Sequence, residues 1–290
     1  MSGGELVAVD TGTMSSLDPD PVEFIADTLD TANTGVPSGT SLTDQGSITY
    51  STNGQTITAK RFTGRVTVTA ANVTFVNCKW DYGDWFQLDT SNSTGPVACN
   101  YCTFDLKNWS SGGSAVYGKN TTLYRCQVLG FENGGKFTAD STLDQCLIHS
   151  PADSAVSGAH VDGWEFYEGS GFTVRDSKIV VTNGATTWSG AGGTTAALNF
   201  STDVGAISDV TVERCRLSGG AYAVYFDEKG PTIRGVTFRD CKINDYLYGP
   251  VARDTDASFD HWSGNYDQGN TSTPSTPGTL IQLLGGGERP

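Results

Sequence analysis

The chain has 290 residues, with 18 Lys plus Arg against 32 Asp plus Glu, so its formal net charge is −14. Such an acidic chain is repelled by phosphates and anionic lipids, which argues against a nucleic acid or a membrane as partner. The 36 glycines and the 17% of charged residues favour a protein of strands and turns. The chain starts without a basic segment followed by an apolar one, and no run of about 18 apolar residues occurs, so we expect neither a secretory signal nor a membrane span.

Seven cysteines make an odd number in a chain for which no export signal is expected. Disulfide frameworks belong to oxidising compartments and use cysteines in pairs. We therefore expect reduced thiols.

Residues 1–31 predict an acidic arm that ends in a short helix. This range contains seven acidic residues and no basic one. Asp20 is suited to the N-cap, Pro21 to the first turn and Glu23 to a capping box. We expect the helix to cover the N-terminal end of the domain that follows, because open strand edges there would invite association.

Residues 32–266 contain a repeated template: apolar, Thr-like, apolar, two polar, Cys or Ser, polar, apolar. Alternation on both sides of the polar pair predicts two strands joined by a tight turn. Successive templates are 20 to 38 residues apart, which is typical of one solenoid coil with loops of variable length. The Cys or Ser of the template occurs at Cys78, Cys102, Cys126, Cys146, Ser177, Cys215 and Cys241.

This repeat predicts an all-β fold, a single-stranded, right-handed parallel β-helix of about eight coils with an N-terminal capping helix. The cysteines should point inward and stack as a ladder with about 4.8 Å between neighbours. Phe166, Phe200 and Phe226 should form a second internal ladder. A β-sandwich would not place Cys or Ser in the same slot of seven repeats.

Residues 267–290 divide into a linker rich in Ser, Thr, Pro and Gly and a short apolar peptide. A free tail has little reason to carry several large apolar side chains, so we expect this peptide to dock on another chain or on the helix of its own chain. The candidate assembly residues are Leu280, Ile281, Leu283 and Leu284.

A family resemblance rests on six blocks: Asn33–Thr43, Val66–Asn77, Ala159–Tyr167, Asp203–Gly205, Gly230–Arg239 and Trp262–Tyr266. They resemble right-handed parallel β-helix proteins of actinobacteria and their tailed viruses, whose genes are commonly labelled minor tail proteins. The resemblance implies a virion protein, synthesised in the cytoplasm of the bacterial host, that contacts other virion proteins. It also implies a homo-oligomer, with a homotrimer as the expected form.

One outer face of the solenoid carries the candidate chemistry. Gln87, Glu165, Asn199 and Tyr225 are expected to form an outward row, with Asp227 in the row beside it. Glu165 and Asp227 would then lie two coils apart, close to the separation of about 6.5–9.5 Å between the carboxyl groups of an inverting glycosidase. They are the candidate catalytic pair of a glycoside hydrolase or polysaccharide lyase. The alternative is a set of solvated carboxylates on an outer face.

His160 and Asp162 point to one face of a strand if the alternation holds. The pair suits a proton relay, half of a metal site or a structural hydrogen bond. No metal-ligand spacing accompanies it, so we expect no metal and no other cofactor. The candidate carbohydrate-binding residues are Gln87, His160, Asp162, Asn199 and Tyr225.

Two further features have competing interpretations. Cys99 and Cys102 form a C-x-x-C pair, but without a helix start or a second pair both should face the core. The loop tryptophans Trp80, Trp85, Trp109 and Trp188 suit either stacking on sugar rings or contacts between chains.

The leading functional hypothesis is a minor tail protein of a tailed actinobacterial virus that attaches to a glycan of the host cell wall. A tailspike-like enzyme that degrades polysaccharide is the first alternative. A capsid decoration protein is the second.

Overall fold

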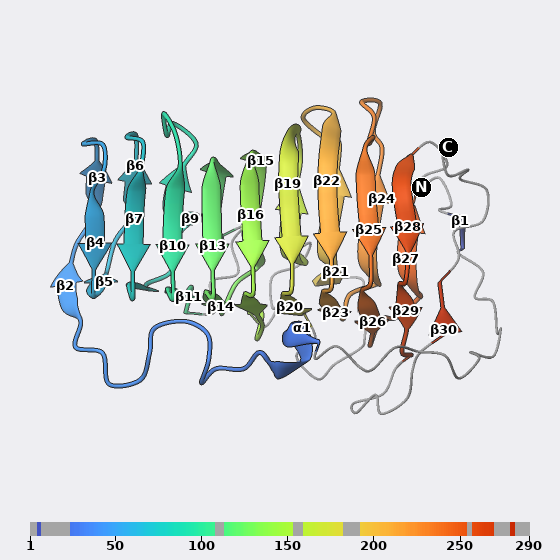
Figure 1. The fold of residues 1–290 in the computed structure, drawn as a ribbon, viewed down its shortest axis with the longest axis horizontal. Coiled ribbons are helices and arrows are strands. Elements are labelled where there is room, and N and C mark those ends of the chain that lie inside the picture. The colour runs from blue at the N-terminus through green and yellow to red at the C-terminus, as the bar shows by residue number, and fades with distance from the viewer. Residues whose placement is uncertain are drawn as a thin grey trace.

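The computed structural model describes residues 5–6, 24–107, 113–152, 159–181, 192–253, 257–269 and 279–281. Three long sheets run along the molecule, and each coil of the chain contributes one strand to each sheet (Figure 1). Neighbouring coils pair in parallel, so the chain forms a right-handed parallel β-helix, as the repeat predicts. The nine strands of the second sheet mark nine coils, where the sequence indicates about eight.

Each sheet takes every third strand of the solenoid. Sheet 1 contains β3 (Ile48–Tyr50), β6 (Val66–Val68), β9 (Phe86–Thr90), β12 (Ser114–Lys119), β15 (Asn133–Ala139), β18 (Ala159–Phe166), β21 (Gly192–Ser201), β24 (Tyr222–Asp227) and β27 (Gly249–Arg253). Sheet 2 contains β4 (Thr56–Thr58), β7 (Val73–Val76), β10 (Val97–Asn100), β13 (Thr121–Tyr124), β16 (Ser141–Asp144), β19 (Gly169–Arg175), β22 (Ile207–Glu213), β25 (Val236–Arg239) and β28 (Phe259–Ser263). Sheet 3 contains β2 (Thr43–Gln45), β5 (Lys60–Phe62), β8 (Lys79–Asp81), β11 (Thr103–Asp105), β14 (Gln127–Leu129), β17 (Leu147–Ile148), β20 (Lys178–Val180), β23 (Arg216–Ser218), β26 (Lys242–Asn244) and β29 (Tyr266–Asp267).

The corner between sheets 2 and 3 is made by one residue in the left-handed region. Its φ is 53° at Asn77 and 51° at Arg125, for example. This conformation costs an L-residue roughly 1–2 kcal/mol. The corner N–H is satisfied by the next coil, since Arg125 N donates to the Asp144 carbonyl at 3.0 Å. The polar pair of the template therefore makes the turn, as the sequence predicts. Positive φ recurs at Asn77, Tyr101, Arg125, Gln145, Asp176, Arg214 and Asp240.

The Cys or Ser after each corner points into the solenoid and links neighbouring coils. All seven cysteines are buried and free, which confirms the expectation of reduced, inward thiols. Cys126 Sγ donates to the Cys99 carbonyl of the preceding coil at 3.2 Å. Ser177 Oγ accepts a bond from Cys146 N at 3.0 Å. In the last coil Asn265 takes this slot, and its Oδ1 accepts from the backbone N–H of the preceding cysteine.

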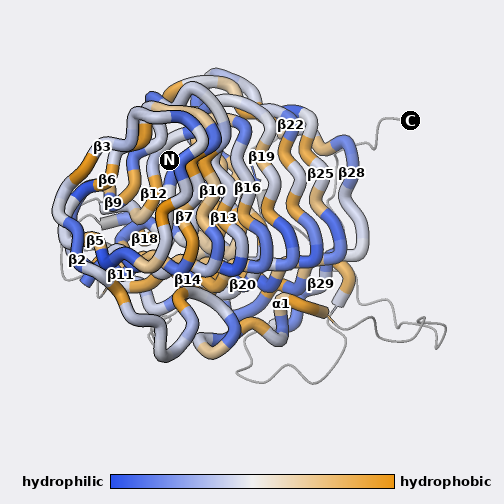
Figure 2. Tube along the Cα trace, turned by 60° about the vertical axis from the view of Figure 1, so that its left-hand side comes forward, coloured by the Kyte–Doolittle hydropathy of each residue, from blue (hydrophilic) through white to orange (hydrophobic). Residues whose placement is uncertain are grey.

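The phenylalanine ladder of sheet 1 is also as predicted. The rings of Phe166 and Phe200 lie 4.6 Å apart at 7°, and those of Phe200 and Phe226 lie 4.7 Å apart at 9°. All three side chains are buried. Figure 2 shows the same principle across the molecule, with hydrophobic and hydrophilic positions in stripes that run from coil to coil.

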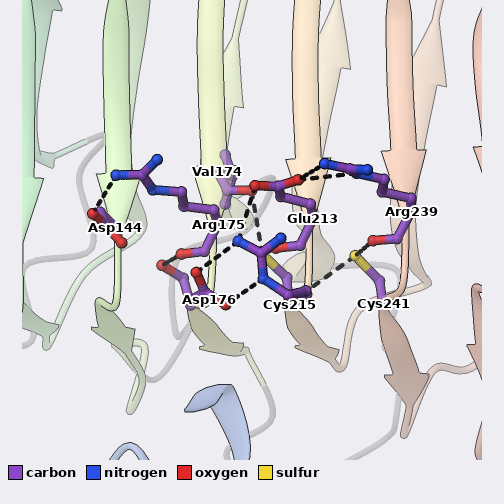
Figure 3. A network of polar contacts seen from close by, with 10 residues as sticks. Asp144, Val174, Arg175, Asp176, Glu213, Cys215, Arg239 and Cys241 are labelled. Atoms are coloured by element: carbon purple, nitrogen blue, oxygen red, sulfur yellow. Dashed lines mark hydrogen bonds and ion pairs between the residues drawn. The ribbon is translucent and has the colours of Figure 1, made fainter. Parts of the chain in front are cut away.

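A row of alternating ion pairs, the ion-pair ladder, crosses the C-terminal ends of successive strands of sheet 2 (Figure 3). Asp144, Arg175, Glu213 and Arg239 are register partners, so acid and base alternate along the solenoid axis. Arg175 bonds to Asp144 at 2.8 Å, and Arg239 Nε bonds to Glu213 at 2.9 Å. The carboxyl groups of Asp144 and Glu213 are buried, whereas the two arginines are partly exposed. Their alternation favours the observed register, because opposite charges lie directly opposite one another and like charges there would be destabilising.

Helix α1 (Ile25–Thr28) is shorter than the sequence suggests and lies elsewhere. Its N-cap is Phe24, which makes no side-chain cap bond, while Asp20 and Glu23 fall outside the described residues. Figure 1 shows α1 beside sheet 3, where Asp27 pairs with Arg216 at 2.7 Å. Basic side chains of sheet 3 therefore hold the helix against the flank of the solenoid.

The segment after α1 runs back along sheet 3 toward the first coil. Gly35, at φ +73°, donates its N–H to the Arg125 carbonyl at 2.8 Å. A Cβ at Gly35 would lie 2.5 Å from Thr103 Oγ1, so this close approach requires glycine. The helix and this segment cover the side of the solenoid. The expectation that the helix covers the N-terminal end is wrong.

The chain covers its own C-terminal end with two short antiparallel strands. β1 (Glu5–Leu6) pairs with β27, and β30 (Thr279–Leu280) pairs with β29. Ile281 is 1% exposed, and its carbonyl accepts a bond from Trp262 Nε1 at 3.0 Å. The open edge of β29 thus accounts for Ile281 without a second chain, contrary to its assignment as an assembly residue. Leu280 remains 37% exposed, and Leu283 and Leu284 lie outside the described residues.

No helix in the described ranges has the length and apolar character needed to cross a membrane.

The phenylalanine ladder generates a prediction about stability. Phe200→Ala should lower the free energy of unfolding by roughly 3–5 kcal/mol, because the ring is buried between two stacked neighbours and its loss leaves a cavity. Phe86→Ala is the matched control, since Phe86 stacks on Tyr117 at 4.4 Å but is only half-buried. Urea denaturation measures both. Equal losses in the two variants would contradict the inward ladder.

Candidate functional site

A groove of about 770 Å³ lies on the outer face of sheet 1. Its walls come from β15, β18, β21 and β24 and from the loops beside them. Six of the candidate catalytic and carbohydrate-binding residues line it: His160, Asp162, Glu165, Asn199, Tyr225 and Asp227.

The floor of the groove is a row of register partners. Lys136, Glu165, Asn199 and Tyr225 follow one another across β15, β18, β21 and β24. Asp227 lies in the neighbouring row. The alternation in these strands therefore places the expected side chains on one face.

Gln87 does not belong to this row, so its assignment to the site is wrong. The residue of β9 that belongs to the row is Asp89, two positions after Gln87. Asp89 pairs with Tyr117, which in turn pairs with Lys136. Gln87 is fully buried, and its Nε2 donates to the Tyr82 and Asp105 carbonyls at 2.6 and 2.9 Å. A polar side chain is expected to point outward, but here the side-chain amide nitrogen donates to backbone carbonyls and the residue is buried.

Two successive residues of β18 point inward, so the acids on either side of them both line the groove. These residues are Gly163 and Trp164, and the acids are Asp162 and Glu165. In a strictly alternating strand, residues three apart would point to opposite faces. The same double inward step occurs in β9 and β24, so it is a recurrent feature of sheet 1.

A β-bulge on β21 shapes the rim. Val161 pairs with Thr194, and the next residue of β18 pairs with Ala196, so Thr195 is the extra residue. Bulges commonly re-aim side chains beside functional sites. Thr195 Oγ1 lies 3.3 Å from Nδ1 of His160, which is exposed at this rim.

The two carboxyl groups are buried and differ in their partners. Asp162 is 0% exposed and Glu165 is 3% exposed. Lys136 Nζ lies 2.8 Å from Glu165 Oε2, and the Tyr167 hydroxyl donates to Glu165 Oε1. Asp162 Oδ2 accepts a bond from Asn199 Nδ2 at 3.2 Å, and no donor reaches Asp162 Oδ1 from the described residues.

Burial affects the ionisation of Asp162. Burial, followed by the charge of Glu165, raises the pKa of Asp162 well above its ordinary value. Lys136 and the Tyr167 hydroxyl hold the carboxyl group of Glu165 in place. The surroundings of Asp162 therefore favour its protonated form. The alternative of solvated outer-face carboxylates is wrong for Glu165, which is buried and paired.

Asp227 lies in a more open part of the groove. It shares Lys229 with Asp203, and Lys229 Nζ lies 3.1 Å from Asp227 Oδ2 and 2.9 Å from Asp203 Oδ1. The Asp227 side chain is 23% exposed. It therefore remains accessible to a ligand in the groove.

Aromatic side chains form one end of the groove. The Tyr222 ring lies 6.1 Å from that of Tyr225 and 5.8 Å from that of Tyr248, and Tyr248 is 56% exposed. The sequence gives no signal for Tyr222 and Tyr248, because only the strand register shows that the start of β24 lies beside the start of β27. Trp85, also 56% exposed, lines another part of the groove. Trp80 is fully buried and stacks on Phe104 in the core, while Trp109 and Trp188 lie outside the described residues.

No group of three or more His, Cys, Asp or Glu side chains with the geometry of a metal site occurs in the part of the chain that the structure describes.

Comparison with known proteins finds similarity in structure alone. No family model and no curated protein sequence matches the chain. The catalytic domain of a GH87 α-1,3-glucanase in complex with tetrasaccharides is similar at 13% identity and a TM-score of 0.38, over 72% of this chain and 45% of that one. The chain thus spans less than half of the glucanase chain. The A-module of mannuronan C-5 epimerase AlgE4 from Azotobacter vinelandii is similar at 11% identity and a TM-score of 0.28, over 81% of this chain and 82% of that one.

A likeness at such low identity concerns the fold alone. The kinship with minor tail proteins of actinobacterial viruses stays a prediction from the sequence.

The buried acid generates a prediction about pH. A folded-state pKa above the unfolded value of about 3.9 means that the wild type loses stability as pH rises through the interval between the two values. Asp162→Asn removes this loss, so the variant should melt at a higher temperature than the wild type near neutral pH, and the difference should shrink toward about pH 4. Thermal unfolding across this range measures the effect.

Asp44→Asn is the control, because the Asp44 side chain is 65% exposed and should not change the pH dependence. Parallel pH profiles for the wild type and Asp162→Asn would show that Asp162 is ionised in the folded protein.

Proposed function

We propose that the groove on sheet 1 binds a glycan and that the protein uses it to attach to a carbohydrate-covered surface. The observation that carries this proposal is the combination, in one groove, of open tyrosine rings with buried carboxyl and amide groups. A sugar ring has a C–H face that packs on aromatic rings and hydroxyls that both donate and accept hydrogen bonds. Tyr222, Tyr225 and Tyr248 match the first property. Asp162 and Asn199 match the second.

The shape of the groove favours a polymer over a single small molecule. Its floor crosses four neighbouring strands, which lie about 4.8 Å apart along the axis. An extended chain can therefore contact equivalent positions of successive coils. The rigid solenoid holds these positions before binding, so little ordering cost is added.

The biological setting that we propose is host attachment by a minor tail protein of a tailed actinobacterial virus. The six sequence blocks that resemble such proteins support it. Other virion proteins would be its partners, and a homotrimer its expected assembly. A copy number of hundreds per particle would favour the capsid decoration protein instead.

Glycan cleavage is a second candidate function, and it is favoured by the burial of Asp162 beside Glu165, which raises the pKa of the Asp162 carboxyl group. In hydrolysis, a carboxylic acid gives its proton to the glycosidic oxygen, the C–O bond breaks, and water adds to the anomeric carbon while a second carboxylate takes the proton of the water. The pairing that we propose differs from the one expected from the sequence. Lys136 and Tyr167 hold Glu165, so we propose Asp162 as the acid and Asp227 as the base.

Glycan binding can be tested with one aromatic substitution. Tyr225→Ala should weaken binding of bacterial cell-wall oligosaccharides by about tenfold, or ~1.4 kcal/mol, because it removes a stacking face from the groove. Tyr124→Ala is the matched control, since Tyr124 is a half-buried tyrosine on sheet 2, away from the groove. Titration calorimetry measures binding, and an assay for new reducing ends on the same samples measures cleavage.

Equal affinity of the wild type and Tyr225→Ala would contradict binding in this groove. New reducing ends that vanish in Asp162→Asn would favour the enzyme, whereas binding without cleavage would favour the attachment protein.

A further inference from the structure

Acidic groups outnumber basic groups in the lining of the groove. Its lining contains five carboxyl groups and two lysines, with no arginine among them. Burial raises the pKa of one of these carboxyl groups, that of Asp162. The four other carboxyl groups still outnumber the two lysines. The acids of the lining are Glu132, Asp162, Glu165, Asp203 and Asp227.

Both lysines are already paired with protein carboxylates. Lys136 Nζ lies 2.8 Å from Glu165 Oε2 and also lies over the Tyr167 ring, 4.6 Å from its centroid. Lys229 Nζ is bonded to Asp203 and Asp227. An acidic ligand would have to displace one of these internal carboxylates to reach a lysine, and the displaced carboxylate would remain close to the ligand.

The rest of the molecule adds to this barrier. The formal net charge of −14 creates a field that opposes the approach of a polyanion. Hydroxyl groups meet no such barrier, because the carboxyl, carboxylate and amide groups of Asp162, Glu165 and Asn199 offer donors and acceptors without requiring a charged ligand.

We propose that the groove is selective for uncharged glycans and excludes chains that carry carboxylate, sulfate or phosphate groups. This specificity rests on the proposed glycan-binding function and assigns its ligand class. The specificity depends on the two lysines. Their charges are neutralised by protein carboxylates, so neither lysine attracts an anionic ligand.

A glycan array that spans neutral, N-acetylated and uronic acid oligosaccharides of equal length tests the proposal. The wild-type protein should retain neutral or N-acetylated members and should not retain oligogalacturonates. Asp203→Asn combined with Asp227→Asn frees Lys229, so this double variant should gain affinity for oligogalacturonates by about tenfold, and the gain should disappear at high salt.

Asp176→Asn combined with Glu213→Gln is the matched control. This variant also loses two negative charges, but they belong to carboxylates outside the groove that pair with Arg214. It should not gain oligogalacturonate binding, which separates an effect of the groove from one of net charge.

The outcomes distinguish the specificity from the function. Retention of oligogalacturonates by the wild type as strongly as neutral chains, or an equal gain in both double variants, would overturn the charge filter and leave glycan binding in place. Retention of no member of the array by the wild type would overturn the glycan-binding function itself.

Discussion

The rest of the structure depends on the corner between sheets 2 and 3, where one residue per coil has a positive φ. One residue per corner takes a conformation that L-residues disfavour, and the next coil satisfies its N–H. Because every coil turns at the same slot, equivalent side chains stack directly above one another. Buried thiols, stacked phenylalanines and alternating ion pairs are three results of this one geometric repeat, and each is satisfied mainly by its counterpart in the next coil.

The groove lies on sheet 1, where strands such as β9, β18 and β24 turn two successive residues inward. In β18 this step places Asp162 and Glu165 on the same face, and the bulge at Thr195 shifts the neighbouring strand. In a strictly alternating strand these carboxyl groups would face opposite sides. Their burial side by side raises the pKa of Asp162.

The sequence predicts what depends on the repeat and misses what depends on contacts between coils. Phe200 occupies its expected slot because alternation alone decides it. Gln87 is misassigned because a polar side chain is expected to face solvent, and the sequence does not reveal the backbone carbonyls that it bonds to. Asp162 and Glu165 share a face because the two residues between them both point inward, which strict alternation does not predict. Ile281 returns to its own last coil, which only the open edge of β29 reveals.

A crystal structure of the protein with a neutral oligosaccharide would test the central claim most directly, namely that the irregular face of sheet 1 is a glycan site. The account predicts a sugar ring against Tyr222 or Tyr225 and hydroxyl groups bonded to Asp162 and Asn199. An oligosaccharide bound to sheet 2 or sheet 3, with the groove empty, would contradict it.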